Sequence, residues 1–203
     1  MSEKKPFFHW LSDISKIHHR AAFSDVAKHT TPKQSPFLKL AASRYSCRAF
    51  KEYAFSEEEL ASILEAGRLA PTACNKQPVH LWVVKKPEAL AKLREVTKYT
   101  FNAPLVIIVG CKPEEAWVRS CDGKNGAEVD AAIVGTHIML EAAALGLATT
   151  WVGSFDPARL KELFPQTADW VPVALFPIGY PAEGPSANHG KRKDWQEIVT
   201  DLV

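Results

Sequence analysis

The stretch Pro104 to Gly110, Pro-Leu-Val-Ile-Ile-Val-Gly, constrains the fold of this chain more than any other segment. It is a continuous apolar run that is bounded by a proline and a glycine. Alternate side chains of a strand point to opposite faces, so a strand that is apolar throughout is buried on both faces. The run therefore predicts a central strand that is covered by other elements on both sides.

Further strands are predicted around it, with helical patterns between them. They cover residues 79–84, 148–152 and 171–178. Residues 37–42 look helical, and Ser56 with Glu59 forms a capping box at the start of another helix. Pro87 and Pro157 are each expected to open a helix at its first position. This interleaved order predicts a layered α+β or α/β domain.

The longest apolar run covers residues 131–148 and contains His137 and Glu141. Those two polar residues make a membrane span unlikely for it and favour a deeply buried helix, with Asp130 as its cap. Residues 1–36 are expected to form an arm, because an amphipathic pattern there is followed by a Pro/Ser/Thr linker. Residues 37–203 would then form one domain.

Composition and charge limit the kind of partner. The chain has 203 residues, 46% of them apolar, and a formal net charge of +2. That charge is too small to argue for nucleic acid. No signal peptide is recognisable, and the four cysteines show neither Cys-x-x-Cys nor a zinc spacing. We therefore expect free thiols, no membrane partner and a cytoplasmic location.

The segment Ser43 to Phe50 carries the main candidate site. Arg44, Ser46 and Arg48 occupy alternate positions, so an extended backbone would point all three the same way. Two guanidinium groups and a hydroxyl suit a phosphate monoester. On these residues alone a solvated strand edge is the simpler interpretation.

Several standard sites are absent from the sequence. It has no Gly-x-Gly-x-x-Gly after a strand, no P-loop, no Gly-x-Ser-x-Gly and no i, i+4 histidine pair for a metal. A phosphate clamp, the amide-rich loop 71–78 and the break at Gly153 and Ser154 remain. This set suits a cofactor that carries its own reactivity, such as a flavin, with no protein group as acid or base.

From Phe37 to Val203 the chain resembles the FMN-dependent nitroreductase family, especially its short bacterial members. Six motifs in order carry the resemblance: residues 43–48, 70–78, 116–119 with 122–124, 130–133, 151–156 and 177–181. The resemblance implies a three-layer α+β fold with a central, mostly antiparallel sheet that is flanked by helices. It also implies a homodimer with FMN at the interface and the long buried helix at the dimer core.

The resemblance also implies roles for particular residues. Arg44 and Ser46 match residues that hold the FMN phosphate and ribityl chain, and Arg48 matches the basic residue near the flavin N1 edge. The loop at 71–77 matches one that reaches the flavin from the other subunit. Residues 151–154 match the segment that offers N–H groups to N5. The whole predicted cofactor-binding set is Arg44, Tyr45, Ser46, Arg48, Pro71, Thr72, Ala73, Asn75, Gln77, Trp151, Val152, Gly153, Ser154, Lys191 and Arg192.

The function that this resemblance implies is an NAD(P)H-dependent FMN oxidoreductase. NADH or NADPH would reduce the flavin, and a nitroaromatic, a quinone or a similar small acceptor would then take the electrons. The alternative is a flavin-binding sensor or partner module without catalysis, and a third possibility is other flavin chemistry, such as dehalogenation. Trp82, Trp117, Trp151 and Trp170 are expected to be core residues and not stacking platforms, and the resemblance gives only Trp151 a reason to touch the flavin ring. Cys74 is expected to be a small buried hydrophobe.

Overall fold

A computed structural model describes residues 31–53 and 55–200, and the amphipathic pattern predicted at the N-terminus lies outside them. Within the described chain, the sheet has four strands in the order β1-β2-β4-β3, and every pair is antiparallel. The strands are β1 (Val79–Val84), β2 (Leu105–Cys111), β3 (Ala148–Thr149) and β4 (Val171–Gly179). Every residue of β2 is buried, which confirms the predicted central strand.

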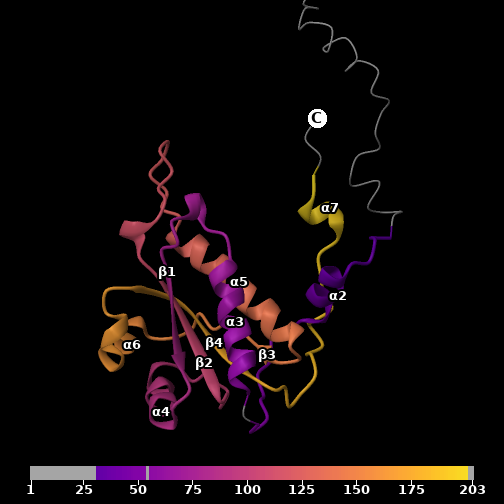
Figure 1. Cartoon of the computed structure of the whole chain (residues 1–203). Helices are drawn as coiled ribbons and strands as arrows, with labels where there is room; N and C mark the ends of the chain where they lie inside the picture. Colours follow the sequence, from indigo (N-terminus) through magenta and orange to yellow (C-terminus); the bar gives the residue numbers. More distant parts are fainter. Residues whose placement is uncertain (1–30, 54, 201–203) are drawn as a thin grey trace, which may run out of the picture. The chain divides into compact units, whose positions relative to one another are not determined.

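Helices cover both faces of this sheet, as Figure 1 shows. The first face packs against α3 (Glu57–Leu69) and α5 (Ala127–Ala144), and the second against α4 (Pro87–Val96) and α6 (Pro157–Leu163). The shorter helices are α2 (Pro36–Ser43) and α7 (Trp195–Ile198), with 3-10 turns at η3 (Ala73–Asn75), η4 (Pro113–Glu115) and η5 (Pro165–Thr167). The predicted three-layer α+β architecture is confirmed.

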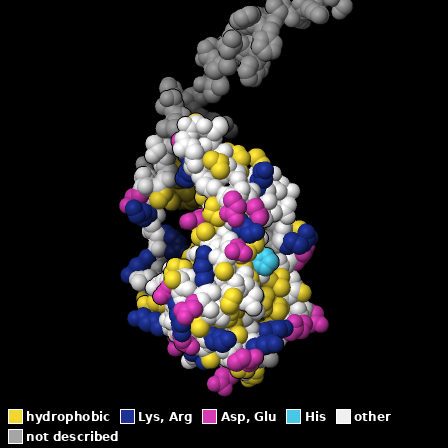
Figure 2. Space-filling view, turned by 90° about the vertical axis from the view of Figure 1, so that its left-hand side faces the viewer, with side chains coloured by type: hydrophobic (Ala, Val, Ile, Leu, Met, Phe, Trp, Pro, Cys, Tyr) yellow, Lys and Arg dark blue, Asp and Glu magenta, His cyan; other side chains and the backbone are white. Residues whose placement is uncertain are grey.

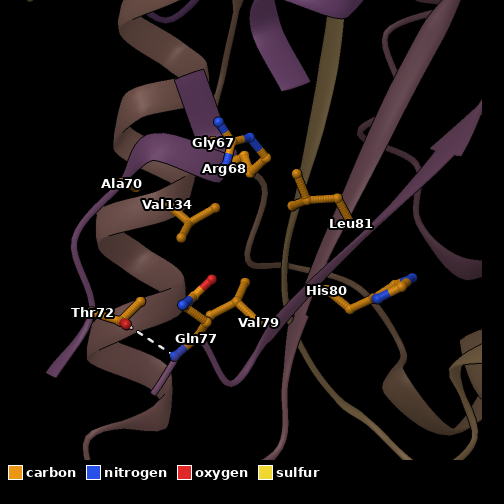
Figure 3. Close-up of a pocket in the computed structure, with 9 residues that line it drawn as sticks. All are labelled: Gly67, Arg68, Ala70, Thr72, Gln77, Val79, His80, Leu81 and Val134. Carbon is orange, nitrogen blue, oxygen red and sulfur yellow. Dashed lines mark hydrogen bonds between the residues drawn. The ribbon is translucent and has the colours of Figure 1, made fainter. Parts of the chain in front are cut away.

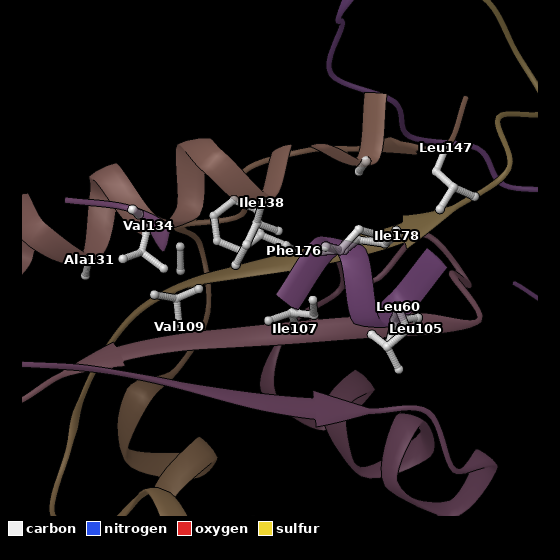
Figure 4. Packing of buried hydrophobic residues seen from close by; sticks show 14 of the residues in the cluster. Leu60, Leu105, Ile107, Val109, Ala131, Val134, Ile138, Leu147, Phe176 and Ile178 are labelled. Atoms are coloured by element: carbon white, nitrogen blue, oxygen red, sulfur yellow. The ribbon is translucent and has the colours of Figure 1, made fainter. Parts of the chain in front are cut away.

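The alternation of side chains along β2 explains the two cores. Leu105, Ile107 and Val109 belong to the cluster beneath α3 and α5, which Figure 4 shows. Val106 and Ile108 belong to the cluster beneath α4 and α6. An apolar side chain at every position of β2 is therefore what allows one strand to support two layers.

The start of α3 follows its local sequence signal. Ser56 Oγ accepts a hydrogen bond from the Glu59 N–H at 3.1 Å, and Glu59 Oε2 accepts one from the Ser56 N–H at 2.6 Å. Tyr180 donates its hydroxyl to Glu59 Oε1 at 2.7 Å. The hydrogen bond from the Ser56 N–H lowers the pKa of Glu59 most, and the bond from the Tyr180 hydroxyl lowers it further. The predicted capping box is therefore confirmed.

The start of α5 differs from its prediction. The helix begins at Ala127 with Gly126 as N-cap, so Asp130 lies inside its first turn and does not cap it. The Ala127 N–H donates to Asn125 Oδ1 at 2.9 Å, and this side chain supplies the acceptor that was expected from Asp130. Asp130 instead bonds to a distant loop, which no local pattern could reveal.

Strand β3 is shorter than the predicted 148–152. It pairs with β4 at Ala148 and Thr149, and pairing in the same register returns at Val152, which bonds to Leu175. In that register Thr150 lies opposite Pro177. Proline has no N–H to donate, so the ladder is interrupted at this point.

Candidate active site

The segment that contains Arg44 to Arg48 runs beside β3. Ser46 forms a parallel bridge with Thr149, and the Cys47 N–H donates to the Thr149 carbonyl at 3.0 Å. Cys47 is buried, whereas Ser46 and Arg48 are exposed and Arg44 is half-buried. The extended conformation that the alternating pattern predicted is therefore present, with the polar residues on the more open side.

Arg44 and Arg48 have no carboxylate partner among the described residues. Arg48 Nη1 donates to the Ser46 carbonyl at 3.2 Å. Arg68, Arg119 and Arg159, by contrast, each form ion pairs with Glu or Asp. An arginine pair that is not neutralised, beside an exposed serine, is a suitable arrangement for an anion such as a phosphate.

Tyr45 helps to fix this segment. Its hydroxyl donates to the Glu183 carbonyl at 2.6 Å, and its ring meets that of His189 edge-on at 6.1 Å. Burial, and to a smaller extent the neighbouring Cys47, raises the pKa of Tyr45. The phenol therefore stays neutral and keeps its donor.

A cavity of about 170 Å³ lies between this segment and the C-terminal half of α5. Arg44, Tyr45 and Thr149 line it together with Met139 and Ala143 of the helix. Thr149 is 3% exposed, and its hydroxyl has no hydrogen-bond partner within the described residues. A buried polar atom without a partner is uncommon in proteins and often marks a functional region. Sequence reasoning missed Thr149, because no local pattern distinguishes it.

The segment Trp151 to Ser154 follows β3 directly. Trp151 is 37% exposed and packs edge-on against Phe176, with ring centroids 5.1 Å apart. Val152 is buried and exchanges two hydrogen bonds of 2.9 Å with Leu175. Gly153 and Ser154 are exposed, and neither backbone N–H donates within the described chain. Two unused backbone donors therefore lie beside an accessible aromatic ring.

The loop Pro71 to Gln77 follows α3 and contains η3. Cys74, Asn75 and Gln77 have φ values of 52°, 52° and 53°, in the left-handed region that costs non-glycine residues about 1–2 kcal/mol each. The Gln77 N–H donates to Thr72 Oγ1 at 3.0 Å, as Figure 3 shows. Cys74 is exposed, so the prediction that it would be a buried hydrophobe is wrong.

A second cavity, of about 340 Å³, lies between this loop, α3, β1 and α5 (Figure 3). Thr72, Gln77, Val79 and Leu81 line it, together with Val134 of α5. The amide of Gln77 and the hydroxyl of Thr72 are the polar groups that the loop contributes to it. The loop is therefore accessible from this side of the sheet edge.

Within one chain, the predicted loop residues lie far from Arg44, Tyr45 and Ser46. Arg44, Tyr45 and Ser46 lie with β3 near Ala143 of α5, whereas Ala73 of the loop bonds to Asp130 in the first turn of the same helix. At a rise of about 1.5 Å per residue, Asp130 and Ala143 are separated by about 20 Å along α5. One chain therefore does not bring the loop Pro71–Gln77 close to the segment Arg44–Arg48, which we call the arginine segment.

Two predicted residues lie in a different unit of the chain. Contacts divide the described chain into residues 35–189 and a unit that combines 31–34 with 190–200, and Lys191 and Arg192 belong to the latter. Arg192 Nη1 donates to the Lys191 carbonyl at 2.8 Å. Their role as phosphate ligands stays a prediction.

A hairpin that sequence reasoning did not identify precedes α5. Val118 bridges Asn125, and the Arg119 guanidinium pairs with Asp122 across its turn. Trp117, Arg119 and Asp130 line a cavity of about 200 Å³ that also touches Ala73. Trp117 and Trp151 are each 37% exposed, so the prediction of a core role is wrong for both. Trp82 and Trp170 are half-buried; their rings meet edge-on, and each is tilted against the ring of His80.

Basic and acidic side chains are interspersed on the face shown in Figure 2, so this face has no large area of one charge. The described residues contain no group of three potential metal ligands. No helix among them has the length and apolar character needed to cross a membrane.

The sequence matches a known protein family and several of its members. A model of the "Nitroreductase family" matches residues 41–101 and 97–180. A Methanothermobacter thermautotrophicus protein that carries the name of an NADH dehydrogenase/NAD(P)H nitroreductase is 31% identical over 160 residues, covering 73% of this chain and 78% of the relative.

Solved structures agree with these matches. The crystal structure of a nitroreductase family protein from Clostridium difficile has a TM-score of 0.77 and 36% identity, over 82% of this chain and 98% of that one. A nitroreductase from Desulfovibrio desulfuricans, solved in complex with FMN, has a TM-score of 0.70 and 26% identity, over 84% and 99% of the two chains. The chain described here belongs to the nitroreductase family.

Proposed function

We propose that this chain is an FMN-dependent oxidoreductase that uses NADH or NADPH to reduce small electron-poor acceptors, such as nitroaromatics and quinones. The observation that carries the proposal is the pair Arg44 and Arg48, which lie beside Ser46 and have no carboxylate partner in the part of the chain that the structure describes. The family match and the FMN complex of the Desulfovibrio relative support it.

The described residues fit such a cofactor. Arg44 and Ser46 would bind its phosphate and ribityl chain. Arg48 would stabilise negative charge at the N1 edge of the reduced ring, because a nearby cation favours that form. The unused N–H groups of Gly153 and Ser154 would donate to N5, beside Trp151. Bound FMN would accept a hydride from the nicotinamide and pass electrons to the acceptor.

We further propose that two copies of the chain build the site together. Val129 and Thr136 are exposed along α5 and share one face with the half-buried Ile133 and Leu140. Antiparallel pairing of this face with the same face of a second copy would place the loop at one end of α5 beside the arginine segment at the other end. The separation of about 20 Å within one chain supports this arrangement.

The visible spectrum of the purified protein tests the cofactor. We expect absorbance of bound flavin, or its appearance after addition of FMN, and bleaching by NADH or NADPH without oxygen. Replacing both Arg44 and Arg48 with Ala should raise the Kd for FMN by at least about 100-fold, because each hydrogen bond to a charged group contributes about 1.5–3 kcal/mol. Arg94→Ala, an exposed arginine of α4, is the matched control.

Two results would count against the proposal. A double arginine variant that keeps full flavin content would remove the role of the arginines. Flavin that stays oxidised with both nicotinamides would favour a sensor or partner module over an enzyme. Turnover of NAD(P)H with a nitroarene or a quinone would exclude that alternative.

The four free thiols fit a reducing compartment, and we propose a cytoplasmic location on that ground.

A further inference from the structure

Asp130 is a buried carboxylate for which the sequence predicted only a capping role. It is 2% exposed and lies in the first turn of α5. Its Oδ1 accepts a hydrogen bond from the Ala73 N–H at 2.9 Å, across 57 positions of sequence. Its Oδ2 is buried and has no hydrogen-bond partner within the described residues.

Among the described residues, the hydrogen bond from the Ala73 N–H to Asp130 is the one that joins residues 72–77 to another element, the helix α5. Within the described chain, the other hydrogen bonds of residues 72–77 stay inside the loop. They join the Asn75 N–H to Thr72, the Lys76 N–H to Ala73, and both the Gln77 N–H and the Gln77 side chain to loop oxygens. These local bonds can shape the loop but cannot fix where it lies on α5.

The loop needs an external anchor, because its conformation is unfavourable by itself. Three of its non-glycine residues have φ values near 52°, and such values persist where the surroundings enforce them. Asp130 is suited to this role, since the positive N-terminal end of α5 stabilises its charge and a charged acceptor strengthens the bond to Ala73.

A purely structural role explains Asp130 poorly. An oxygen that is buried without a partner is destabilising, and a side chain with a single acceptor atom could bond to the Ala73 N–H without that unfavourable contribution. Groups that are unfavourable for stability tend to be kept where function needs them. The distant segment that Asp130 holds is the one proposed to contact FMN.

We propose that Asp130 is a positioning residue for FMN binding: through its hydrogen bond to the Ala73 N–H it holds the loop Pro71–Gln77 in the conformation that meets the cofactor. The proposal rests on the proposed function, because it assumes that the loop contacts FMN. Asp130 acts through the loop and does not itself touch the cofactor.

The test is a series of full-length variants whose Kd for FMN is measured by quenching of flavin fluorescence, alongside the Tm of the flavin-free protein. Asp130→Ala should raise the Kd at least tenfold, whereas Asp130→Asn, which keeps an acceptor oxygen, should stay within about threefold of the wild type. Glu128→Ala removes an exposed carboxylate from the same helical turn and should leave the Kd unchanged.

Ala73→Pro tests the same bond from the loop side and serves if Asp130→Ala fails to fold. Ala73 opens η3 and follows an extended Thr72, where a proline is tolerated, so the substitution removes the donor with little change of backbone. If both residues act through one bond, the double variant should bind FMN no more weakly than the weaker single variant.

The outcomes separate this inference from the proposed function. A wild-type protein that does not bind FMN would overturn both. If the wild type binds FMN and Asp130→Ala binds it equally well, only the inference fails. An Asp130→Asn variant as weak as Asp130→Ala would also overturn it, and so would a lower Tm with an unchanged Kd, because either result would show that the hydrogen bond to Ala73 does not position the loop.

Discussion

The four thiols of this chain should differ sharply in reactivity. Cys47 and Cys111 are buried, whereas Cys74 and Cys121 are exposed. Burial, with smaller effects from Glu128, Glu114 and Asp130, raises the pKa of Cys111 to about 11. A thiol with a raised pKa is protonated below that pH, and the thiolate is the reactive form. Cys111 should therefore be inert at pH 8 for two reasons, its burial and its protonation.

Labelling with a maleimide at pH 8, followed by mass spectrometry, checks this expectation. The folded protein should take two labels, at Cys74 and Cys121, and the denatured protein should take four. A variant with both exposed cysteines changed to Ser should take none while folded. Rapid labelling of Cys111 in the native protein would contradict the assigned burial.

At the scale of elements, α5 approaches the sheet closely at Gly135. A Cβ built on Gly135 would lie 2.5 Å from Cζ of Phe176 and 3.0 Å from Cζ3 of Trp151. Only a residue without a side chain allows the helix and the two rings to occupy these positions. This contact sets the depth at which α5 lies and also supports Trp151, a residue of the proposed site.

Gly135→Ala should destabilise the protein, although alanine favours a helix by about 1 kcal/mol over glycine. Overpacking of a filled core costs about 1–3 kcal/mol, and here the clash involves ring atoms that have little freedom to move. We expect Tm to fall by about 2–4 °C or more, measured by circular dichroism. Lys92→Ala, on the exposed side of α4, should not lower Tm. A higher Tm for Gly135→Ala would refute the tight contact.

For the whole molecule, the proposed pairing of α5 makes assembly and cofactor binding depend on each other. Val129 is 52% exposed, and Thr136, which is also exposed, lies about two helical turns further along the same face. Replacing both with Glu would place charges in the proposed interface without entering the core of one chain. Light scattering should then show a monomer with intact circular dichroism, and FMN binding should be lost with the dimer.

Lys92→Glu provides the matched control for that experiment. It changes a charge on the exposed side of α4, which covers the other face of the sheet. This variant should remain a dimer and keep its flavin. A protein that stays dimeric with both α5 substitutions would require a different interface, and a monomer that binds FMN with full affinity would show that one chain is sufficient.

Much of the fold could be predicted from local patterns. The apolar run 104–110, the capping box at Ser56 and the prolines at the starts of α4 and α6 each depend on residues within a few positions of one another. The extended arginine segment could be predicted for the same reason, because the alternation of Arg44, Ser46 and Arg48 is itself the signal.

The sequence by itself determined the strands, most helix starts and the order of the family motifs, because these follow from interactions between near neighbours in the chain. Only the tertiary structure decided that Asp130 anchors a loop instead of capping α5, that Thr149 lies beneath the arginine segment, and that Pro177 interrupts β3. Each of these depends on residues that are far apart in sequence: a residue of α5 and the loop in the first case, and paired extended segments in the other two. The physical reason is that a hydrogen bond forms between neighbours in space, whereas a sequence pattern reports neighbours along the chain.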